Sequence, residues 1–214
     1  MDKSLRSRRT FVTGAVGSLL AAGVSPRLPN FVLIYCDDLG YGDLGCYGSP
    51  IRTPNLDRMA KEGMRFTSCL TANPICSPSR AGLLTARYPT RVGVPTVFFP
   101  KDKTGLNLDE QTLPQLLKSA GYGTACVGKW HLGRPDEYLP TSRGFDSYFG
   151  IPYSNDMKPA VMLRNKEVVE PETDQTTLTP RYTEESLKFI TASKDRPFFL
   201  YLAPNYPHIP LHAS

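Results

Sequence analysis

The chain has 214 residues, which is enough for one substantial hydrophobic core or two small ones. Its composition, 40% hydrophobic and 21% charged, is that of an ordinary soluble globular protein, and its 20 prolines and 17 glycines predict many turns and loops. The net charge is +5, but four basic residues and one acidic residue near the N-terminus contribute +3 of it: Lys3, Arg6, Arg8, Arg9 and Asp2. The remaining charge of about +2 argues against a nucleic-acid-binding protein, so no nucleic-acid partner is expected.

Residues 1–26 predict an export signal. The stretch "SLRSRRTFVTGAVGSLLAAGVSP" combines a basic start containing Arg8 and Arg9, an apolar run of small residues and a break at Pro26, which is the layout of a twin-arginine-like signal. The alternative is a disordered basic tail. This run is too short to cross a bilayer, and no other segment could, so we expect an exported protein, periplasmic or extracellular, without a stable membrane anchor.

An apolar run at residues 31–35, "FVLIY", predicts a fully buried strand of the kind found in parallel sheets. Asp37 and Asp38 follow it directly. Two adjacent carboxylates repel each other where a buried strand emerges, and a hard divalent cation such as calcium or magnesium would neutralise them. The alternative is a pair of solvated loop aspartates.

Residues 53–62 predict a helix that Thr53 caps and Gly63 ends. Three apolar side chains would share its inward face: Leu56, Met59 and Ala60. The following stretch "MRFTSCL", residues 64–70, could form the next strand.

The segment "NPICSPSRAGLLTAR", residues 73–87, places a cysteine beside a predicted helix start. Ser77 is a good N-cap and Pro78 suits the first helical position, so Cys76 would lie just outside the helix N-terminus. Free backbone N–H groups there favour an anion and lower a thiol pKa, and Arg80, one turn in, adds a fixed cation. The alternative is a buried cysteine in an ordinary capping turn.

Residues 112–133, "TLPQLLKSAGYGTACVGKWHLG", predict a helix, a glycine stop at Gly121 and a strand. The inward helix positions would be Leu113, Leu116, Leu117 and Ala120. Lys129 and His131 would share one face of the strand end, where they could grip an anion and move a proton, while Trp130 would pack on the other face. The alternative is a solvated strand end. Residues 134–178 predict loops, with weak strands at "AVML" and "KEVVE".

A last helix, capped by Thr179 and Pro180, precedes an apolar strand at residues 198–202. His208 follows that strand in the proline-bracketed turn "APNYPHIPLH", whereas His212 is best explained as structural. Alternating helices and apolar strands predict an α/β fold with a mostly parallel central sheet flanked by helices. Ligands bind beyond the carboxyl ends of strands in such sheets, so the charged groups at those ends predict a site for an oxyanion ester with a metal ion.

Five cysteines follow no zinc-binding spacing: Cys36, Cys46, Cys69, Cys76 and Cys126. An exported protein could pair some of them, and an odd number leaves at least one unpaired. We expect that one to be Cys76, whereas the sequence leaves the pairing of the others open.

The chain resembles the sulfatase family, and within it the arylsulfatase A-like branch. "CSPSRAGLLTA" is similar to the sulfatase signature, and "NFVLIYCDDLGYGDLGCYG", "GYGTACVGKWHLG", "GFDSYFGIPYSND" and "RPFFLYLAPNYPHIPLH" resemble further family blocks in the same order. The resemblance implies an alkaline-phosphatase-like sulfatase core, of which residues 27–214 would be the N-terminal part.

The resemblance also implies a chemistry for Cys76. The cysteine of this motif is oxidised to formylglycine by a sulfatase-maturation enzyme such as the formylglycine-generating enzyme, and the hydrated aldehyde is the nucleophile. One hydroxyl attacks sulfur and expels the alcohol, and the other helps to eliminate sulfate. Asp37 and Asp38 would bind calcium, with magnesium as the alternative, and the modified Cys76 would also reach the metal.

Further roles carry over by motif for five residues. Arg80 would hold the formylglycine hydrate, and Lys129 would contact the sulfate. His131 would hydrogen-bond the formylglycine and assist elimination. Ser154, in "GIPYS", would orient the sulfate-ester substrate, and His208 would protonate the leaving oxygen and contact the substrate.

Three departures from the family pattern stand out. Ala86 replaces the usual glycine after Thr85, which leaves the Cys-x-Pro-x-Arg core intact. Asn155 stands where relatives often carry histidine, which predicts altered substrate contacts. The family's second pair of metal ligands, an Asp-Asn, and a second sulfate-binding lysine have no match after His208. We therefore expect a core truncated on its C-terminal side, and weak calcium binding and little turnover by residues 1–214 alone.

Two alternatives to a sulfuric ester hydrolase remain open at this point. One is a phosphodiester or phosphonate ester hydrolase on the same fold. The other is a non-catalytic, truncated fragment that keeps half of the site.

Overall fold

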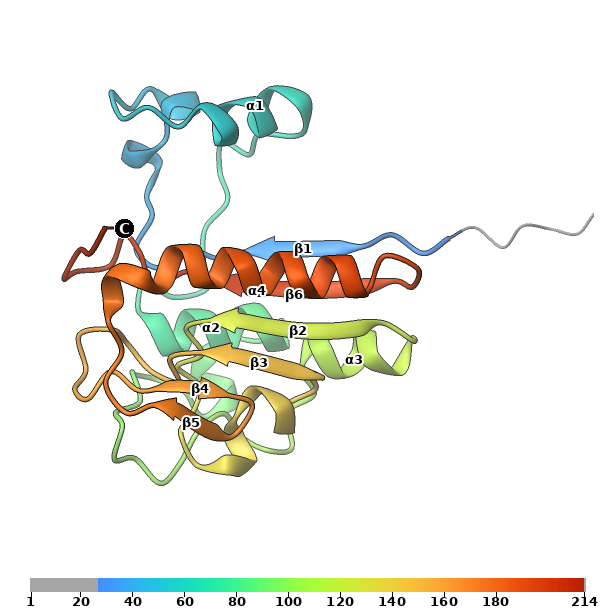
Figure 1. Ribbon diagram of the computed structural model, residues 1–214, viewed down its shortest axis with the longest axis vertical. Helices are drawn as coiled ribbons and strands as arrows, with labels where there is room; N and C mark the ends of the chain where they lie inside the picture. Colours follow the sequence, from blue (N-terminus) through green and yellow to red (C-terminus); the bar gives the residue numbers. More distant parts are fainter. Residues whose placement is uncertain (1–26, 214) are drawn as a thin grey trace, which may run out of the picture.

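The computed structural model describes residues 27–213 (Figure 1). The predicted export signal at residues 1–26 lies outside the described residues. Within the described part of the chain, no helix is both long enough and apolar enough to cross a membrane.

Six strands form one sheet in the order β1-β6-β2-β3-β4-β5. The pairs β1/β6, β6/β2 and β2/β3 are parallel, whereas β3/β4 and β4/β5 are antiparallel. The sheet is therefore mixed but mostly parallel, which confirms the predicted α/β fold. The strand bounds are β1 Phe31–Ile34, β2 Gly123–Gly128, β3 Ser147–Gly150, β4 Met162–Arg164, β5 Glu167–Glu170 and β6 Phe198–Ala203.

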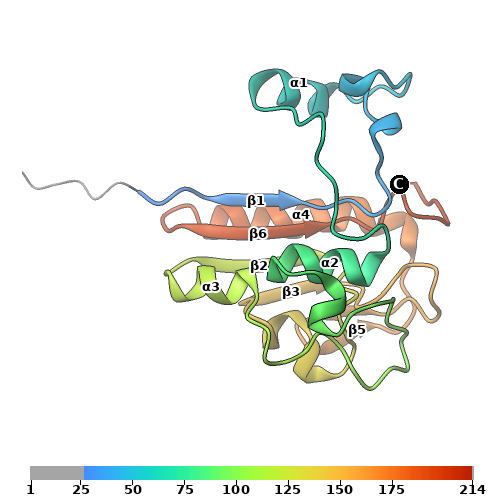
Figure 2. The same cartoon turned by 180° about the vertical axis from the view of Figure 1, so that it is seen from behind.

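Helices cover both faces of the sheet centre. Helix α4 lies over one face in Figure 1, and α2 and α3 lie over the other face in Figure 2. The α-helices are α1 Pro54–Glu62, α2 Cys76–Thr85, α3 Leu113–Ser119 and α4 Leu178–Ala192. Short 3-10 helices in the described connections are Tyr41–Asp43, Gly45–Tyr47, Pro89–Val92, Asp136–Tyr138, Pro140–Ser142 and Gln175–Thr177.

Strand β6 shows why both faces are apolar. Its side chains alternate, so Phe199 and Tyr201 join the core beneath α2 and α3, while Phe198 and Leu200 join the core beneath α4. All but one of its residues are buried. A strand covered by helices on both faces is apolar at nearly every position, and this pattern correctly predicted a strand at residues 198–202.

Strand β1 differs from its prediction. It lies at the edge of the sheet and pairs only with β6, and Phe31, Val32 and Ile34 are 43–49% exposed. Leu33 alone of this strand packs against the core. The prediction of a fully buried strand was wrong. Apolar residues favour burial, but they do not determine whether a strand lies at the centre or at the edge of the sheet, which depends on its partners.

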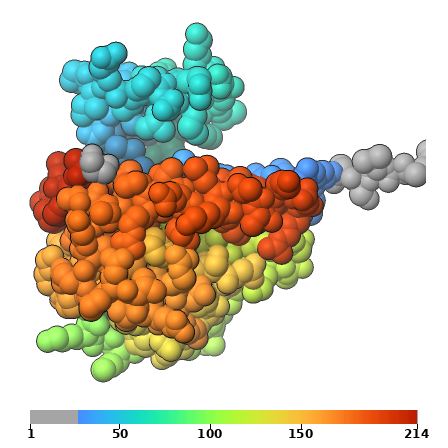
Figure 3. All heavy atoms as spheres, in the orientation of Figure 1, coloured from blue at the N-terminus to red at the C-terminus, as the bar shows by residue number. Residues whose placement is uncertain are grey.

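Residues 39–70, which include α1, lie apart from the sheet and are joined to it by two stretches of chain (Figures 1–3). Helix α1 buries none of its residues, and Leu56 and Met59 are exposed, so its predicted inward face does not reach the core. The predicted strand at 64–70 is irregular chain. A local polar network holds this unit, because Thr53 and the carboxylate of Asp57 bond each other and the backbone of residues 45–46.

Other predictions shift by a few residues. Helix α2 starts at Cys76 itself, since Ser77 accepts a hydrogen bond from Phe98 instead of capping the helix. Helix α4 starts before the predicted cap, with Thr177 at its N-cap. Leu116 and Ala120 of the α3 region are exposed, while Leu113 and Leu117 pack inward as predicted. The weak strands predicted at "AVML" and "KEVVE" correspond to β4 and β5. Strand β3 was missed because it is short and lies within residues 134–178, which were predicted to form loops.

Candidate active site

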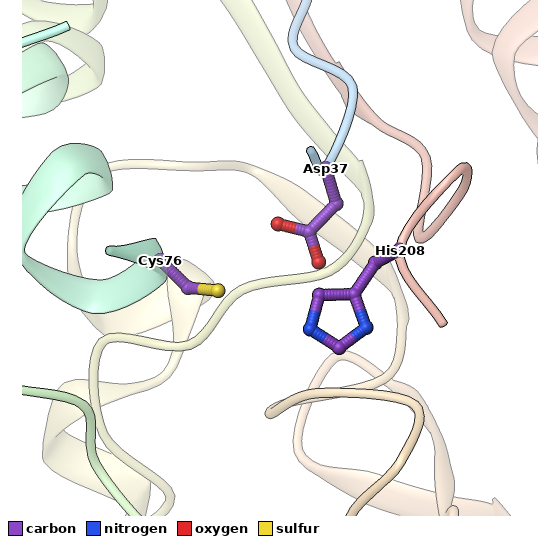
Figure 4. Close-up of side chains that lie close together, drawn as sticks. All are labelled: Asp37, Cys76 and His208. Atoms are coloured by element: carbon purple, nitrogen blue, oxygen red, sulfur yellow. The ribbon is translucent and has the colours of Figure 1, made fainter. Parts of the chain in front are cut away.

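Three strand ends and one helix start meet at one edge of the sheet. Asp37 follows β1, Lys129 follows β2 and His208 follows β6, while Cys76 opens α2. The side chains of Asp37, Cys76 and His208 point toward one another (Figure 4), and one potential ligand atom from each lies within 4.8 Å of the others. The convergence follows from the parallel pairing of these strands, because their carboxyl ends share one edge.

Asp37 lies between two buried cations. The Arg80 guanidinium donates to its Oδ1 at 3.1 Å, and the Lys129 ammonium donates to its Oδ2. All three side chains are at most 4% exposed. Burial raises the pKa of Asp37, but Arg80 and Lys129 more than offset that effect, so the pKa lies below its ordinary value. With the carboxylate ionised, the trio carries one net positive charge and favours an anion.

Arg80 is fixed by aromatic residues as well. Its Nη1 donates to the Lys129 carbonyl and to the Tyr201 hydroxyl, both at 3.1 Å, and its guanidinium lies 5.5 Å from the ring centroid of Tyr35. Tyr35 in turn hydrogen-bonds Ser79 of α2. Sequence reasoning missed Tyr35 and Tyr201. The available signal was that each of the two apolar runs, residues 31–35 and 198–202, carries a tyrosine near its C-terminal end.

Ser154 belongs to the same site. Its hydroxyl accepts a hydrogen bond from Lys129 at 3.0 Å, and the side chain is buried. The structure thus brings Ser154 together with Lys129 and Asp37, although about 25 residues separate it from the nearest of them in sequence.

His131 and Lys129 do not share a strand face as predicted, because β2 ends at Gly128 and His131 adopts a positive φ of 61°. The ring is buried, its Nε2 lies 2.9 Å from the Phe98 carbonyl oxygen, and its Nδ1 has no partner among the described residues. Burial, together with the positive charges of Lys129 and Arg80, lowers its pKa to about 3. His131 is therefore a neutral imidazole at neutral pH. Trp130 packs in the core as predicted.

Asp38 lies beside His208 rather than inside the cluster. Its carboxylate is 3.9 Å from His208 Nε2 and largely exposed. His208 Nδ1 donates to the Ile209 carbonyl oxygen, so Nε2 is the ring nitrogen on the side of the Asp38 carboxylate.

The Cys76 thiol does not follow its prediction. Burial raises its pKa, and the carboxylate of Asp37 adds to this effect, while Lys129 and Arg80 act in the opposite direction. The net shift is upward, because the cations are already engaged by Asp37 and the thiol has left water. The unmodified Cys76 thiol is thus a poor nucleophile in the folded chain.

A pocket of about 370 Å³ opens beside the cluster, between the end of β1 and the start of α2. Its lining includes Asp37, Asp38, Cys76 and Arg80, together with Cys36 and Asn73. This volume lies within the usual range for small-molecule sites.

A family model described as Sulfatase matches residues 29–214. The chain belongs to the sulfatase family. It is 46% identical to N-acetylgalactosamine-6-sulfatase of Rattus norvegicus, a match that covers 95% of this chain and 44% of that protein. It is 42% identical to arylsulfatase A of Homo sapiens, over 92% of this chain and 45% of that protein. This sulfatase chain thus spans less than half the length of these curated relatives.

Solved structures agree with this assignment. The sulfatase chain is similar to PsFucS1 sulfatase from Pseudoalteromonas sp., with a TM-score of 0.80 and 30% identity over 88% of this chain and 46% of that chain. Ps i-CgsB in complex with k-i-k-neocarrahexaose has a TM-score of 0.78 and 34% identity, over 87% of this chain and 47% of that chain. BT4656 in complex with its substrate D-glucosamine-2-N, 6-O-disulfate has a TM-score of 0.68 and 30% identity, over 85% of this chain and 35% of that chain. These likenesses confirm the predicted sulfatase fold.

The donor set of this sulfatase site suits one side of a hard-cation site. Asp37 offers a carboxylate oxygen within 4.8 Å of the Cys76 sulfur, Asp38 lines the same pocket with a second carboxylate, and oxygen is the ligand that calcium and magnesium prefer. Calcium takes about six to eight oxygens, so these residues would supply a minority of the coordination shell.

Two sequence expectations concern residues near this site. All five cysteines are free, including Cys76. Asn155 is fully buried, and its amide nitrogen donates to Gln175 and to the Pro210 carbonyl oxygen, each at 3.2 Å. It therefore ties down the turn that carries His208, which sequence reasoning did not foresee.

Proposed function

We propose that the protein hydrolyses a sulfate ester with a formylglycine formed from Cys76. The observation that supports this most is the trio of Asp37, Arg80 and Lys129, in which a buried carboxylate is shared by two cations close to Cys76. A single excess positive charge in a water-poor site suits the singly charged sulfate ester, and it would stabilise the charge that develops as the ester bond breaks.

The formylglycine hydrate would supply the attacking hydroxyl. Asp37 and Asp38 would hold a calcium or magnesium ion, which would supply Lewis-acid stabilisation. Lys129 and Ser154 hold a sulfate oxygen and orient the substrate, since their side chains are already hydrogen-bonded. Arg80 holds the side chain at position 76. His208, with Asp38 as its carboxylate partner, donates a proton to the leaving oxygen. His131 hydrogen-bonds the formylglycine and assists the elimination of sulfate.

We propose a sulfated sugar as the substrate class. The names of the relatives support it, because one is an N-acetylgalactosamine-6-sulfatase and BT4656 is described with a disulfated glucosamine. We also propose that residues 1–26 direct export to the periplasm or the exterior, and that a sulfatase-maturation enzyme modifies Cys76.

The first experiment replaces the nucleophile. In Cys76→Ala of the full-length protein, turnover of 4-nitrophenyl sulfate falls to background, since alanine cannot be converted to formylglycine. Mass spectrometry of the peptide that contains residue 76 checks the modification in the unaltered protein. The matched control is Cys69→Ala, which removes an exposed cysteine outside the pocket and retains turnover. Unchanged turnover in Cys76→Ala would rule out this mechanism.

The phosphate alternative needs its own comparison. The same preparation is assayed with 4-nitrophenyl sulfate and with bis(4-nitrophenyl) phosphate, which share a leaving group. Faster sulfate hydrolysis is expected, whereas faster phosphodiester hydrolysis would assign the site to the other reaction.

A further inference from the structure

Asn155 uses both hydrogens of its side-chain amide on neighbouring parts of the chain. The residue is fully buried, and its Nδ2 lies 3.2 Å from the Pro210 carbonyl oxygen and 3.2 Å from Gln175 Oε1. A carbonyl oxygen can only accept a hydrogen bond, so the atom that faces Pro210 must be the nitrogen. Both N–H groups of Asn155 are thus engaged, and neither is left for a substrate.

The remaining polar atom of this side chain is no sulfate ligand either. Asn155 Oδ1 is buried and has no partner among the described residues. This oxygen and the oxygens of a sulfate ester all accept hydrogen bonds and donate none. The altered substrate contacts expected at Asn155 would therefore arise through the residues that it holds.

Gln175 holds the same turn from the other side. Its Nε2 donates to the Asn155 backbone carbonyl oxygen at 2.8 Å, and its own backbone carbonyl oxygen accepts a hydrogen bond from the Tyr206 hydroxyl, also at 2.8 Å. Tyr206 and Pro210 lie two residues before and two residues after His208. One pair of buried amides therefore fixes the turn on both sides of His208.

Asn155 also directly follows Ser154, whose hydroxyl accepts a hydrogen bond from Lys129 at 3.0 Å. The amide pair thus connects the side of the site that would hold sulfate with the turn of His208. Asn155 and Pro210 are 55 positions apart in the sequence, so this connection depends on the fold. Breaking it would leave buried polar groups without partners, which costs free energy and makes the spacing resistant to change.

We propose that Asn155 and Gln175 are positioning residues that set the spacing between Ser154 and His208, and so keep the leaving oxygen of a sulfate ester within reach of His208. Without the pair, Lys129 and Ser154 would still hold the sulfate group, but His208 would no longer meet the leaving oxygen. The roles of Ser154 and His208 rest on the proposed function, whereas the fixed turn does not.

Two aryl sulfates separate a loss of positioning from general structural damage. A 4-nitrophenolate leaves readily without help, whereas a phenolate leaves poorly and depends on His208. In the full-length Asn155→Ala variant, we expect kcat to fall about 100-fold for phenyl sulfate and about 10-fold for 4-nitrophenyl sulfate, while KM changes by less than about threefold. Equal losses of kcat for the two esters would overturn the proposal.

Tyr206→Phe is the milder variant, because it keeps the ring and removes only the hydroxyl that bonds Gln175. It should lower kcat for phenyl sulfate more than for 4-nitrophenyl sulfate, and it decides the question if Asn155→Ala does not fold. The matched control is Ser186→Ala, which also removes a buried hydroxyl, one that bonds the Tyr182 carbonyl oxygen within α4. The ratio of the two kcat values should stay unchanged in this control.

The variant His208→Gln separates a failure of this proposal from a failure of the proposed function. Equal losses for the two esters in His208→Gln, or no hydrolysis by the unaltered protein, would count against the proposed function. A loss confined to phenyl sulfate in His208→Gln, but in neither Asn155→Ala nor Tyr206→Phe, would overturn the positioning role alone.

Crystal structures of the unaltered protein and of Asn155→Ala test the turn without any turnover. Residues 206–210 are expected to shift relative to Ser154 in the variant. A turn that keeps its place without the Asn155 amide would overturn the proposal, whatever the activity measurements show.

Discussion

Asp37 is the residue on which the charge balance of the site depends. Its carboxylate neutralises one of two cations that are themselves almost completely buried, Arg80 and Lys129. Removing one partner from a buried ion pair leaves an uncompensated charge, which costs more than the pair itself contributes. The same carboxylate that would bind a cation therefore also holds the site together without one.

We predict that Asp37→Asn lowers the free energy of unfolding by about 3–5 kcal/mol, because both cations lose their buried counter-charge while the side chain keeps its shape. Urea denaturation in the presence of a chelator measures the change without any contribution from bound metal. The control is Asp38→Asn, whose largely exposed carboxylate should matter by no more than about 0.5 kcal/mol. Equal stability of the two variants would contradict this account of Asp37.

At the scale of elements, ion pairs tie the antiparallel edge of the sheet to α4. Arg164 of β4 makes two hydrogen bonds to Glu185, at 2.9 and 3.0 Å, and Arg181 of α4 pairs with Glu170 of β5. Both guanidinium groups lie near the ring of Phe149, at 4.6 and 5.3 Å from its centroid. The hairpin of β4 and β5 is thus held to the helix by ion pairs in addition to apolar packing.

The hydrogen bonds from Arg164 lower the pKa of Glu185, against the opposing effect of burial and with help from Lys188. Its folded pKa is below its unfolded value, so its contribution to stability is present above about pH 4.5 and is lost as the pH falls through the folded pKa. We predict that acidification below this pH lowers the free energy of unfolding of the unaltered protein by more than it lowers that of Glu185→Gln. Urea denaturation of both proteins at a series of pH values measures this difference.

The exposed neighbour Glu184→Gln is the control and should lose stability on acidification as the unaltered protein does. The same acid sensitivity in all three proteins would show that the Arg164 contact contributes nothing.

Local patterns predicted most elements, but not how they are arranged. Residues 31–35 and 198–202 are equally apolar, yet one strand is an exposed edge and the other a buried centre. The convergence of Asp37, Cys76 and His208 was predictable because strand ends in parallel sheets share an edge. The contact of His131 with the Phe98 carbonyl was not predictable, since it joins residues 33 positions apart that belong to no common motif.

At the scale of the whole molecule, residues 39–70 form a separate outlying unit (Figure 3). Helix α1 contributes no buried residue, whereas every residue of β2 is buried. A segment with few buried apolar contacts opens at a lower free energy than the core does.

We predict that the amide hydrogens of α1 exchange through opening of this unit alone, well before those of β2 and β6. Hydrogen–deuterium exchange followed by mass spectrometry of peptides measures the difference. The amides of α4, a helix that packs on the sheet, are the control and should exchange with the core. Matching protection in α1 and α4 would show that the unit and the sheet unfold together.

The pairing of β1 with β6 has a consequence for the order in which the protein forms. Asn30 bonds Phe198 across 168 positions of chain, so the first strand to be synthesised finds its partner only when the sixth has been made. At a synthesis rate of about 5–20 residues per second, this wait lasts roughly 10 to 30 seconds. Asp37, at the end of β1, cannot meet His208 before then. On the ribosome, the cluster of Asp37, Cys76 and His208 therefore comes together only after the chain has been made through residue 208, and the apolar β1 strand stays without its partner until then.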